Sequence, residues 1–471
     1  MGESIWFIDA VARETTLFAA VGLLIGGVDD FLVDLVFLIG RWRRGGRPRL
    51  TLATLPPPHR SGRIVVFVAA WDEVAVIGNM LTTAVQRFDH PDYRIYVGLY
   101  PNDRGTIRAA SAVAERDPRI RLVIGTRDGP TTKADCLNTL WHALQRDDAR
   151  TGVATKAIVL HDAEDVVHAD ELRIFDALIE QHDYVQLPVL PLVNRRAQLV
   201  SGHYADEFAE AHAKQLVVRT ALGAGMPLAG TGCAITPDIL AVIAAERGGD
   251  PFDATSLTED YELGLRMADL GARGLFARID DARGGIVAVR AFFPGTIDAA
   301  VRQKTRWMTG IALAGWDRTG WARPLAFADH WMRMRDRRGP LAVVVLAMAY
   351  CALPVWALAA VLHWYIGSSP APGGWPGLWL LAVNTVLLLW RLGTRMIFTG
   401  RSYGLREAFW SLPRFVVGNF VALNAAPRAL VRYIRMLRGA APVWDKTSHE
   451  FPDAPAMGPA TSPAIVSTDL P

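Results

Sequence analysis

The sequence has 471 residues, of which 51% are hydrophobic, and the apolar excess gathers at the two ends of the chain. Its formal net charge of +3 gives no support to a nucleic-acid partner, and its basic residues stand beside the apolar segments instead. Three scattered cysteines provide neither a disulfide framework nor a metal-ligand spacing, so we expect a reducing, cytosolic setting for the middle of the chain.

The first predicted element is a membrane helix over residues 17–39, within an N-terminal anchor over residues 1–45. A bilayer crossing needs about 20 mostly apolar residues. The arginine-rich stretch 41–49 marks the cytosolic end of this helix, which leaves the N-terminus in the periplasm. Three acidic residues interrupt the apolar run: Asp29, Asp30 and Asp34. Two explanations stay open, because the acids can face a protein-lined groove or the helix can be shallow and keep them near water.

A cytosolic α/β domain is predicted over residues 60–325, after a proline-rich linker. Apolar, strand-like runs recur there, with helix-length segments between several of them, over residues 64–70, 93–99, 121–125, 158–160 and 184–187. This alternation is typical of a mainly parallel sheet that is covered by helices on both faces. Ligands bind such sheets at the carboxyl ends of the strands, so the residues that follow each strand are candidate ligand contacts.

Acidic side chains follow the first two predicted strands, Glu73 after the first and Asp103 after the second. An acid in this position can accept hydrogen bonds from a uracil or a ribose, although many such acids cap the next helix instead. Lys133 stands at the start of a predicted helix, where a cation is unfavourable unless a negative group such as a diphosphate lies nearby. A solvated surface lysine is the alternative interpretation.

The strongest local signal is the acidic cluster that follows the strand at 158–160. Asp162, Glu164 and Asp165 lie within four positions, and carboxylates so close repel one another unless a cation shares them. Asp162 and Glu164 stand two apart on an extended backbone, so both can face one Mg²⁺ or Mn²⁺ ion that substrate phosphates also bind. A cluster that only caps a helix is the alternative.

Later motifs offer a base and a donor site. The small-residue stretch 230–235 suits a close approach of the backbone to a sugar or an acceptor. The Thr-Glu-Asp motif that ends at Asp260 has two possible explanations. Its acids can simply stabilise the start of a helix, or Asp260 can project into the cleft and act as a general base. Gln303, Arg306 and Trp307 fall on one helical face and suit a diphosphate and a sugar ring, or a basic patch at a membrane surface.

A C-terminal membrane region is predicted over residues 338–440. Two apolar segments, 341–364 and 378–398, form a hairpin whose arginine-flanked ends both lie in the cytosol. The segment 408–425 contains a proline and an arginine and precedes further arginines, so we expect an amphipathic helix on the cytosolic surface and not a third crossing. The tail 441–471 is expected to be cytosolic and partly disordered.

Five motifs, in chain order, resemble those of the processive-type family 2 glycosyltransferases: a strand-end acid, Lys-Ala-x-x-Leu-Asn, Asp-x-Asp, Thr-Glu-Asp and Gln-x-x-Arg-Trp. They extend over residues 64–316, with Glu164 in place of the second aspartate of the metal motif. The segments Tyr100-Pro-Asn-Asp103, Asp162-Ala-Glu-Asp165 and Trp444-Asp-Lys-Thr-Ser-His449 resemble the catalytic part of the inner-membrane phage-adsorption protein B group. The resemblance implies a GT-A domain, α/β in class, with N-terminal and C-terminal transmembrane helices.

The resemblance also implies donor and metal roles for the matching residues. Glu73 and Asp103 would hold the nucleoside of the donor. Lys133 and Asp162 would flank the donor diphosphate. Asp162 and Glu164 would bind the Mg²⁺ or Mn²⁺ ion, since glutamate also coordinates such cations.

The remaining implied roles concern the acceptor and the leaving group. Asp260 would deprotonate the acceptor, which Glu259 and Trp307 would contact. Gln303, Arg306 and Trp307 would secure the donor pyrophosphate and position the acceptor sugar. No covalent sugar–enzyme intermediate is required, because a single in-line displacement inverts the anomeric carbon.

The implied function is that of a metal-dependent hexosyltransferase at the bacterial inner membrane, with a UDP-sugar as the expected donor and a growing cell-envelope glycan or exopolysaccharide as the acceptor. Two alternatives stay open: non-processive transfer to a lipid-linked acceptor, or a non-catalytic membrane scaffold for secretion or phage adsorption. Four membrane segments are few for a pore, which motivates the hypothesis of an export partner in the envelope or of an oligomer.

Overall fold

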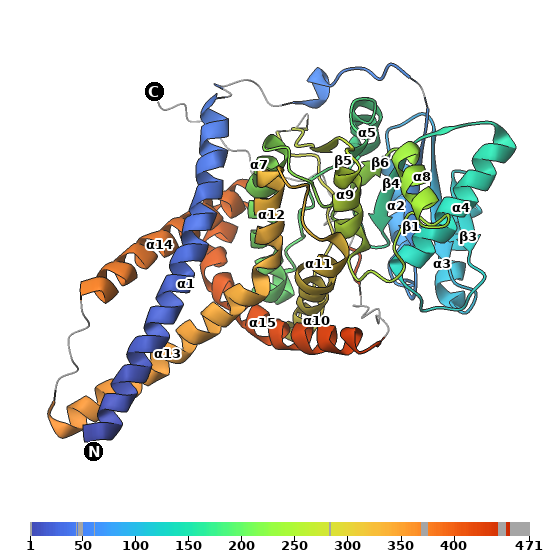
Figure 1. Cartoon of the computed structure of the whole chain (residues 1–471). Helices are drawn as coiled ribbons and strands as arrows, with labels where there is room; N and C mark the ends of the chain where they lie inside the picture. The colour runs from blue at the N-terminus through green and yellow to red at the C-terminus, as the bar shows by residue number, and fades with distance from the viewer. Residues whose placement is uncertain are drawn as a thin grey trace.

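A seven-stranded sheet forms the centre of the domain that follows the N-terminal helix (Figure 1). The computed structural model describes residues 2–43, 45, 50–60, 62–281, 284–368, 375–440 and 449–452. The strands are β1 (Arg63–Ala69), β2 (Tyr93–Leu99), β3 (Ile120–Ile124), β4 (Thr155–Asp162), β5 (Tyr184–Gln186), β6 (Cys233–Ile235) and β7 (Gly274–Phe276). Their order across the sheet is β3-β2-β1-β4-β6-β5-β7.

The predicted α/β class is confirmed, and the five predicted strands are β1 to β5. The strands β1 to β4 pair in parallel, as their apolar sequences predict. The far end of the sheet differs, because β6 runs antiparallel to both β4 and β5. The strands β6 and β7 were not predicted, since each has only three residues and is too short to show a period.

Helices cover both faces of the sheet, which explains the unbroken apolar run of β1. Ile64, Val66 and Val68 face one layer, which consists of α2 (Ile77–Arg87), α3 (Arg104–Ala114) and α5 (Glu171–Leu178). Val65 and Phe67 face the other layer, which consists of α4 (Lys133–Thr151), α8 (Pro237–Glu246) and α9 (Glu259–Asp269). Alternate side chains of one strand therefore enter two separate cores.

The carboxyl ends of β1 and β4 meet at the point where the chain reverses its direction across the sheet. From β1 the chain adds β2 and β3 on one side, and it then returns to place β4 on the other side of β1. The last register pair of these two strands is Ala69 with Asp162. A crevice opens at such a switch point in parallel sheets, and it is there that ligands bind.

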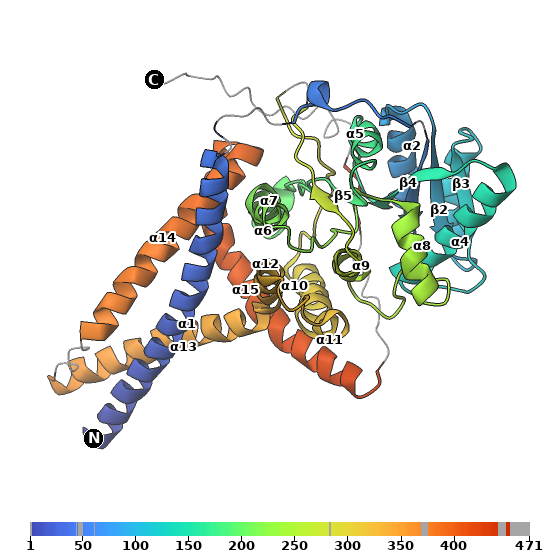
Figure 2. The same cartoon turned by 45° about the horizontal axis from the view of Figure 1, so that its top comes forward.

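A further group of helices lies between the sheet and the C-terminal helices (Figure 2). Two single turns, η1 (Leu52–Thr54) and η2 (Arg195–Ala197), precede it in the chain. The group consists of α6 (Val200–Glu210), the π-helical turn η3 (Ala211–Gln215), α7 (Leu216–Ala221), α10 (Ile297–Trp307), the π-helical turn η4 (Met308–Leu313), α11 (Ala314–Thr319) and α12 (Phe327–Arg337). These elements lie between the crevice and the long helices of the chain.

Three long helices project from one side of the domain: α1 (Gly2–Arg43), α13 (Gly339–Ile366) and α14 (Trp375–Tyr403) (Figures 1 and 2). Within the described residues, two helices are long and apolar enough to cross a membrane, Gly339–Ile366 and Gly377–Tyr403. They contain the two predicted hairpin segments. The helix α1 packs along α13, where Trp356 donates to Thr16 at 2.7 Å and His363 lies 3.0 Å from Asp9. It begins earlier than the predicted span, which started at residue 17.

The acidic residues of α1 face protein. Asp29 accepts a hydrogen bond of 2.6 Å from the Trp331 indole, and Arg338 lies 2.5 Å from it. Asp30 pairs with Arg335 at 2.9 Å and also with Arg391. Of the two explanations for these acids, the structure supports a protein-lined environment, and the arginines that define it stand directly before α13 and within α14.

The helix α15 (Leu405–Leu437) contains the predicted amphipathic segment 408–425 and packs against α6, α10 and α14. Its Arg414 side chain is fully buried and lies 3.3 Å from Asp206 of α6. The arginine that argued against a membrane crossing is thus folded against the domain, while the position of α15 at a membrane surface stays a prediction. Of the predicted disordered tail, 441–448 and 453–471 lie outside the described residues.

Candidate active site

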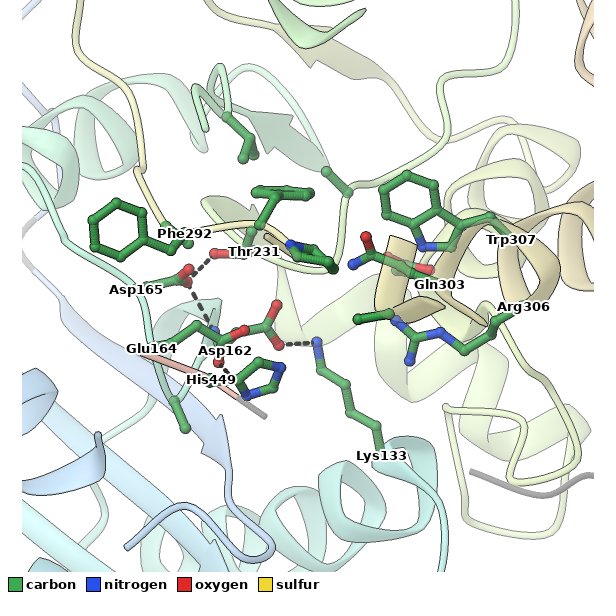
Figure 3. A pocket seen from close by; sticks show the side chains of 18 of the residues that line it. Lys133, Asp162, Glu164, Asp165, Thr231, Phe292, Gln303, Arg306, Trp307 and His449 are labelled. Carbon is green, nitrogen blue, oxygen red and sulfur yellow. Dashed lines mark hydrogen bonds and ion pairs between the residues drawn. The ribbon is translucent and has the colours of Figure 1, made fainter. Parts of the chain in front are cut away.

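A cavity of about 320 Å³ opens at the carboxyl ends of β1 and β4. All the predicted site residues except Asp103 line it: Glu73, Lys133, Asp162, Glu164, Glu259, Asp260, Gln303, Arg306 and Trp307. Figure 3 shows that Asp162 and Glu164 lie on one side of this cavity, whereas Gln303, Arg306 and Trp307 enter from the opposite side, on α10. The fold thus brings together motifs that are far apart in the sequence.

Asp103 lies outside the cavity, where it supports the turn that carries Glu73. Its side chain caps α3 by accepting from the Thr106 amide at 3.1 Å, and its other oxygen accepts from the Asp72 amide at 2.6 Å. Asp72 has a φ of +54°, which is uncommon for a residue other than glycine and needs such support. The Thr106 hydroxyl accepts from the Glu73 amide at 2.9 Å. The helix-capping alternative therefore describes Asp103, whose predicted contact with the nucleoside stays a prediction.

Lys133 is the first residue of α4, as predicted, and its ammonium group points at Asp162 (Figure 3). It also donates to the Gly230 carbonyl at 3.1 Å. Although burial opposes its charge, the nearby carboxylates, Asp162 above all, raise the pKa of Lys133. A cation at a helix N-terminus is unfavourable by itself, so its acidic neighbours hold it charged inside the cavity.

Glu164 forms a group with Glu73 and His449 at the carboxyl ends of β1 and β4. Ligand atoms of Glu73, Glu164 and His449 all lie within 4.8 Å of one another, an arrangement that could hold a metal ion. His449 Nδ1 lies 2.8 Å from Glu73 Oε1 and 3.3 Å from Glu164 Oε2. Burial raises the pKa of Glu164 to about 8 against the opposing charge of His449. Asp162 pairs with Lys133, and the binding of one cation by Asp162 and Glu164 together stays a prediction.

A buried network fixes the turn that carries Asp162 and Glu164. His161, the penultimate residue of β4, lies between Asp165 at 2.8 Å and Glu171 at 2.6 Å, and all three are buried. The Asp165 carboxylate also accepts from the Asp162 amide at 2.8 Å and from the Thr231 hydroxyl. Although burial opposes the charge of His161, its two carboxylate neighbours raise its pKa to about 10. Asp165 thus lines the cavity and also supports the turn that carries Asp162.

Asp260 stands in the first turn of α9 beside a glycine that permits its close approach. Gly230 has a φ of +75°, and a Cβ atom there would come within 2.5 Å of Asp260 Oδ2. Thr258 occupies the N-cap position, but its hydroxyl makes no hydrogen bond with the described residues, while the acids Glu259 and Asp260 do stand in the first turn, so the role of Asp260 as a general base stays a prediction. Burial and then the charge of Glu259 raise the pKa of Asp260 to about 7, against the opposing charge of Lys133.

Gln303, Arg306 and Trp307 line the cavity along one face of α10, as predicted. Gln303 Oε1 and Arg306 Nε are buried and have no hydrogen-bond partner among the described residues. Such orphaned polar atoms cost stability unless a ligand satisfies them. The Trp307 ring packs edge-to-face against Tyr204 of α6, with ring centroids 5.9 Å apart. This contact fixes the indole at the rim of the cavity.

Other residues that line the cavity were not assigned from the sequence, among them Thr231, Phe292, Phe293 and His449. Thr231 belongs to the small-residue stretch 230–235, for which the sequence predicted a close approach of the backbone but no role for this side chain. Phe292 and Phe293 stand in an irregular segment that carries no motif. His449 ends a motif that carries part of the family resemblance, but nothing in the spacing predicts that a residue beyond all the C-terminal helices returns to the end of β1.

Comparisons with known proteins agree with this geometry. Residues 59–310 match the glycosyltransferase-like family 2. The chain is similar to the bacteriophage adsorption protein B of Escherichia coli (strain K12), with 33% identity over 480 residues that cover 95% of this chain and 64% of that protein. The bacteriophage N4 adsorption protein B of Escherichia coli O157:H7 matches with the same identity and coverage. The chain thus spans less than two thirds of the length of these relatives.

Two solved structures resemble the chain more distantly. The mannosyltransferase PcManGT from Pyrobaculum calidifontis, in complex with GDP-Man and Mn²⁺, gives a TM-score of 0.47 at 20% identity and covers 86% of this chain and 97% of its own. The glucosyl-3-phosphoglycerate synthase from Mycobacterium tuberculosis, in complex with Mn²⁺, UDP-glucose and phosphoglyceric acid, gives 0.34 at 14% identity and covers 59% of this chain and 88% of its own.

Proposed function

The chain belongs to the family 2 glycosyltransferases and has their GT-A fold, and on this premise we propose that it transfers a sugar from a nucleotide-sugar donor to a growing cell-envelope glycan, with inversion at the anomeric carbon. One observation carries this proposal. A single cavity collects an acidic floor, the strongly perturbed carboxyl group of Asp260, and the unsatisfied polar atoms of Gln303 and Arg306. These are the groups that an activated hydroxyl and a leaving diphosphate require.

The donor site is proposed between the floor and α10. Arg306 Nε has no hydrogen-bond partner among the described residues, and Arg306 lines the cavity together with Gln303 and Lys133. A diphosphate would satisfy the cationic groups, because guanidinium and phosphate oxygens form charge-assisted hydrogen bonds. Glu73, beside Ala69 at the end of β1, is proposed to contact the nucleoside end of the donor. A UDP-sugar is the donor that we expect first.

The residues of the floor also fit a divalent cation. Asp162 and Glu164 offer the carboxylate oxygens that Mg²⁺ and Mn²⁺ accept, and both line the cavity beside the proposed diphosphate position. Such a cation, when bound, would neutralise negative charge on the leaving nucleoside diphosphate. Lys133 would hold Asp162 in place until the donor arrives.

Asp260 is proposed as the general base. Its carboxylate would take the proton of an acceptor hydroxyl, while the hydroxyl oxygen forms a bond to the anomeric carbon and the bond to the diphosphate oxygen breaks. A pKa of about 7 suits this role, because a base is most effective when its pKa lies near the working pH. Glu259 and Trp307, which both line the cavity, are proposed to contact the acceptor.

The proposed setting is the inner membrane, with the catalytic domain over residues 60–325 in the cytosol. The arginines of α12 stand directly before α13, and positive residues favour the cytosolic side of a crossing. We propose that α1 anchors the chain, that α13 and α14 cross as a hairpin, and that α15 lies along the surface. The acceptor glycan would then leave the cavity close to the bilayer, with or without an envelope export partner.

The test is the release of nucleoside diphosphate from a panel of nucleotide sugars, measured on the full chain in detergent with Mg²⁺ or Mn²⁺. We expect release from one donor class, and we expect Asp260→Asn to lower it by about 10³-fold, within the range that general-base catalysis contributes. Asp162→Ala should abolish the dependence of diphosphate release on Mg²⁺ or Mn²⁺. The exposed Asp238 of α8 provides a matched control, since Asp238→Asn should release diphosphate at the wild-type rate.

Two outcomes would count against the proposal. A folded wild-type chain that releases diphosphate from no donor would favour a scaffold. Equal rates for Asp260→Asn and Asp238→Asn would remove Asp260 from the reaction. The thermal unfolding midpoints of both variants must match that of the wild-type chain, so that a loss of folding is not mistaken for a loss of chemistry.

A further inference from the structure

Lys304 stands inside the Gln-x-x-Arg-Trp motif of α10, but the transfer mechanism proposed above gives it no task. The residues of this motif that were assigned to the donor line the cavity, whereas Lys304 is not among the described residues that do so. Its side chain is only 21% exposed. A lysine that is largely removed from water needs a partner for its charge, because burial of an unpaired charge costs free energy.

The partner of Lys304 is Glu207 of α6. Lys304 Nζ lies 2.5 Å from Glu207 Oε2, and this ion pair joins α6 to α10. Although burial opposes the charge of Glu207, Lys304 above all lowers the pKa of Glu207 to about 2. The carboxylate is therefore charged near neutral pH, and it gives the ammonium group of Lys304 a fixed position.

The ammonium group of Lys304 lies over two aromatic rings. Its nitrogen is 5.5 Å from the centroid of the Trp307 ring and 5.9 Å from that of the Tyr204 ring. A cation within about 6 Å of a ring centroid is attracted to the face of the ring. Tyr204 also meets the same indole edge-to-face. Lys304 therefore adds an electrostatic constraint to the packing of the Trp307 ring.

The remaining neighbours of the Trp307 indole are apolar. The rings of Phe208 and Phe293 lie 6.2 Å and 6.4 Å from it, centroid to centroid, and both side chains line the cavity. Apolar packing is largely non-directional and permits a ring at a cavity wall to turn. An ion pair held between two helices favours one orientation of the indole over the others.

We propose that Lys304 is a positioning residue, which Glu207 holds over the Trp307 ring so that the indole presents one face to the acceptor sugar. This inference rests on the transfer proposed above and on the acceptor contact proposed for Trp307, and it adds the pair that fixes this contact. A sugar that rests against a displaced ring would hold its hydroxyl away from Asp260, and a misplacement of about 1 Å can cost about 10²-fold in rate. Water would then compete with the acceptor for the activated sugar.

The test uses membrane vesicles from cells that produce the full chain, with the best donor of the panel labelled in its sugar. Two products of one reaction are measured: sugar bound to a larger acceptor, and free monosaccharide, which reports transfer to water. We expect Lys304→Met to lower the formation of bound sugar by about 10-fold, which corresponds to about 1.4 kcal/mol and lies within the range of a cation–π contact removed from water. The release of free monosaccharide should not fall, and KM for the donor should stay at the wild-type value, because the donor groups are unchanged.

Three further variants sharpen the test. Lys304→Arg keeps a cation that pairs with a carboxylate and lies over an aromatic face, so it should restore most of the bound sugar. Arg302→Met removes an exposed cation from the same helix and should behave like the wild-type protein. Glu207→Gln should lower bound sugar as well, and its addition to Lys304→Met should cause little further loss, because the effects of two residues that act as one pair are not additive.

Different results would overturn this inference and the proposed function. If the wild-type protein forms bound sugar and Lys304→Met forms it as fast as Arg302→Met does, the inference alone is overturned. An equal loss of bound sugar and free monosaccharide would assign Lys304 to donor binding and would overturn it too. If the wild-type protein forms no bound sugar from any donor, the proposed function fails and the inference fails with it. If thermal unfolding shows that Lys304→Met does not fold, the same comparison between Glu207→Gln and the wild-type protein decides.

Discussion

Two groups of buried acids, one along α1 and one in the cavity, differ in how their negative charge is balanced. On α1, Asp29 and Asp30 face arginines of α12 to α14, and Asp34 pairs with Lys214 while it accepts from the Trp390 indole at 2.7 Å. These acids have partners supplied by the fold. Buried charge that is matched in this way stabilises a packing arrangement and leaves little for a ligand to add.

The cavity shows the opposite arrangement. Its carboxylates outnumber its cations at short range, and burial raises the pKa of Glu164 to about 8 and that of Asp260 to about 7. On the facing side, Arg306 keeps a buried nitrogen without a partner among the described residues. Both sides are incomplete in the absence of ligands, so a cation and a diphosphate would satisfy the two sides together. Unbalanced buried charge distinguishes this site from the acids of α1, although both consist of the same residue types.

Removal of the Arg306 side chain should slow turnover far more than any change to the acids of α1. Arg306→Ala takes away a cation that would stabilise the leaving diphosphate, so kcat should fall by about 10²- to 10³-fold, as for other groups that stabilise transition-state charge. Arg302 on the same helix is exposed and pairs with Asp298, so Arg302→Ala is the matched control and should keep the wild-type rate. Steady-state kinetics with the best donor provide the measurement, and equal rates for the two variants would contradict the assignment.

The raised pKa of Asp260 predicts a smaller effect, on the pH dependence of transfer. Burial and the charge of Glu259 hold this pKa at about 7, so the carboxyl keeps its proton at lower pH and cannot accept one from the acceptor. The value of kcat/KM should therefore fall about tenfold for each pH unit below about 7. Glu259→Gln removes the neighbouring charge and should shift the acidic limb to lower pH. If the acidic limb of the pH profile does not shift in Glu259→Gln, then a group other than Asp260 causes it.

The parts of the molecule that could be predicted from the sequence are those that local patterns determine. The unbroken apolar runs of β1 and β4 and the acids that follow them lie within a few residues of each other, so one stretch of sequence predicts both the strand end and the site residue. Lys133 could be predicted because its position at the start of a helix needs a negative neighbour, and Asp162 is that neighbour.

The parts that could not be predicted depend on contacts between distant segments. Nothing in the sequence around Asp30 indicates whether it meets water or Arg391, because helix packing decides this. Asp103 has the same local signal as Glu73, yet it caps α3 while Glu73 enters the cavity. The place of His449 depends on the packing of Phe451 against a core that forms from the other end of the chain.

The last prediction concerns the acids of α1, whose substitution should change turnover least. Asp30→Asn leaves the charges of Arg335 and Arg391 without their full counterpart, and because this group is partly buried the loss should cost about 1 to 3 kcal/mol of unfolding free energy. Glu14, exposed on the same helix beside Arg13, is the matched control, since Glu14→Gln should change stability by less than about 0.5 kcal/mol. Thermal unfolding in detergent should separate the two variants, while the folded fraction of each should transfer sugar at the wild-type rate. A folded Asp30→Asn protein with slow transfer would show that the balanced acids of α1 take part in the reaction, and the distinction between matched and unmatched charge would then no longer identify the active site.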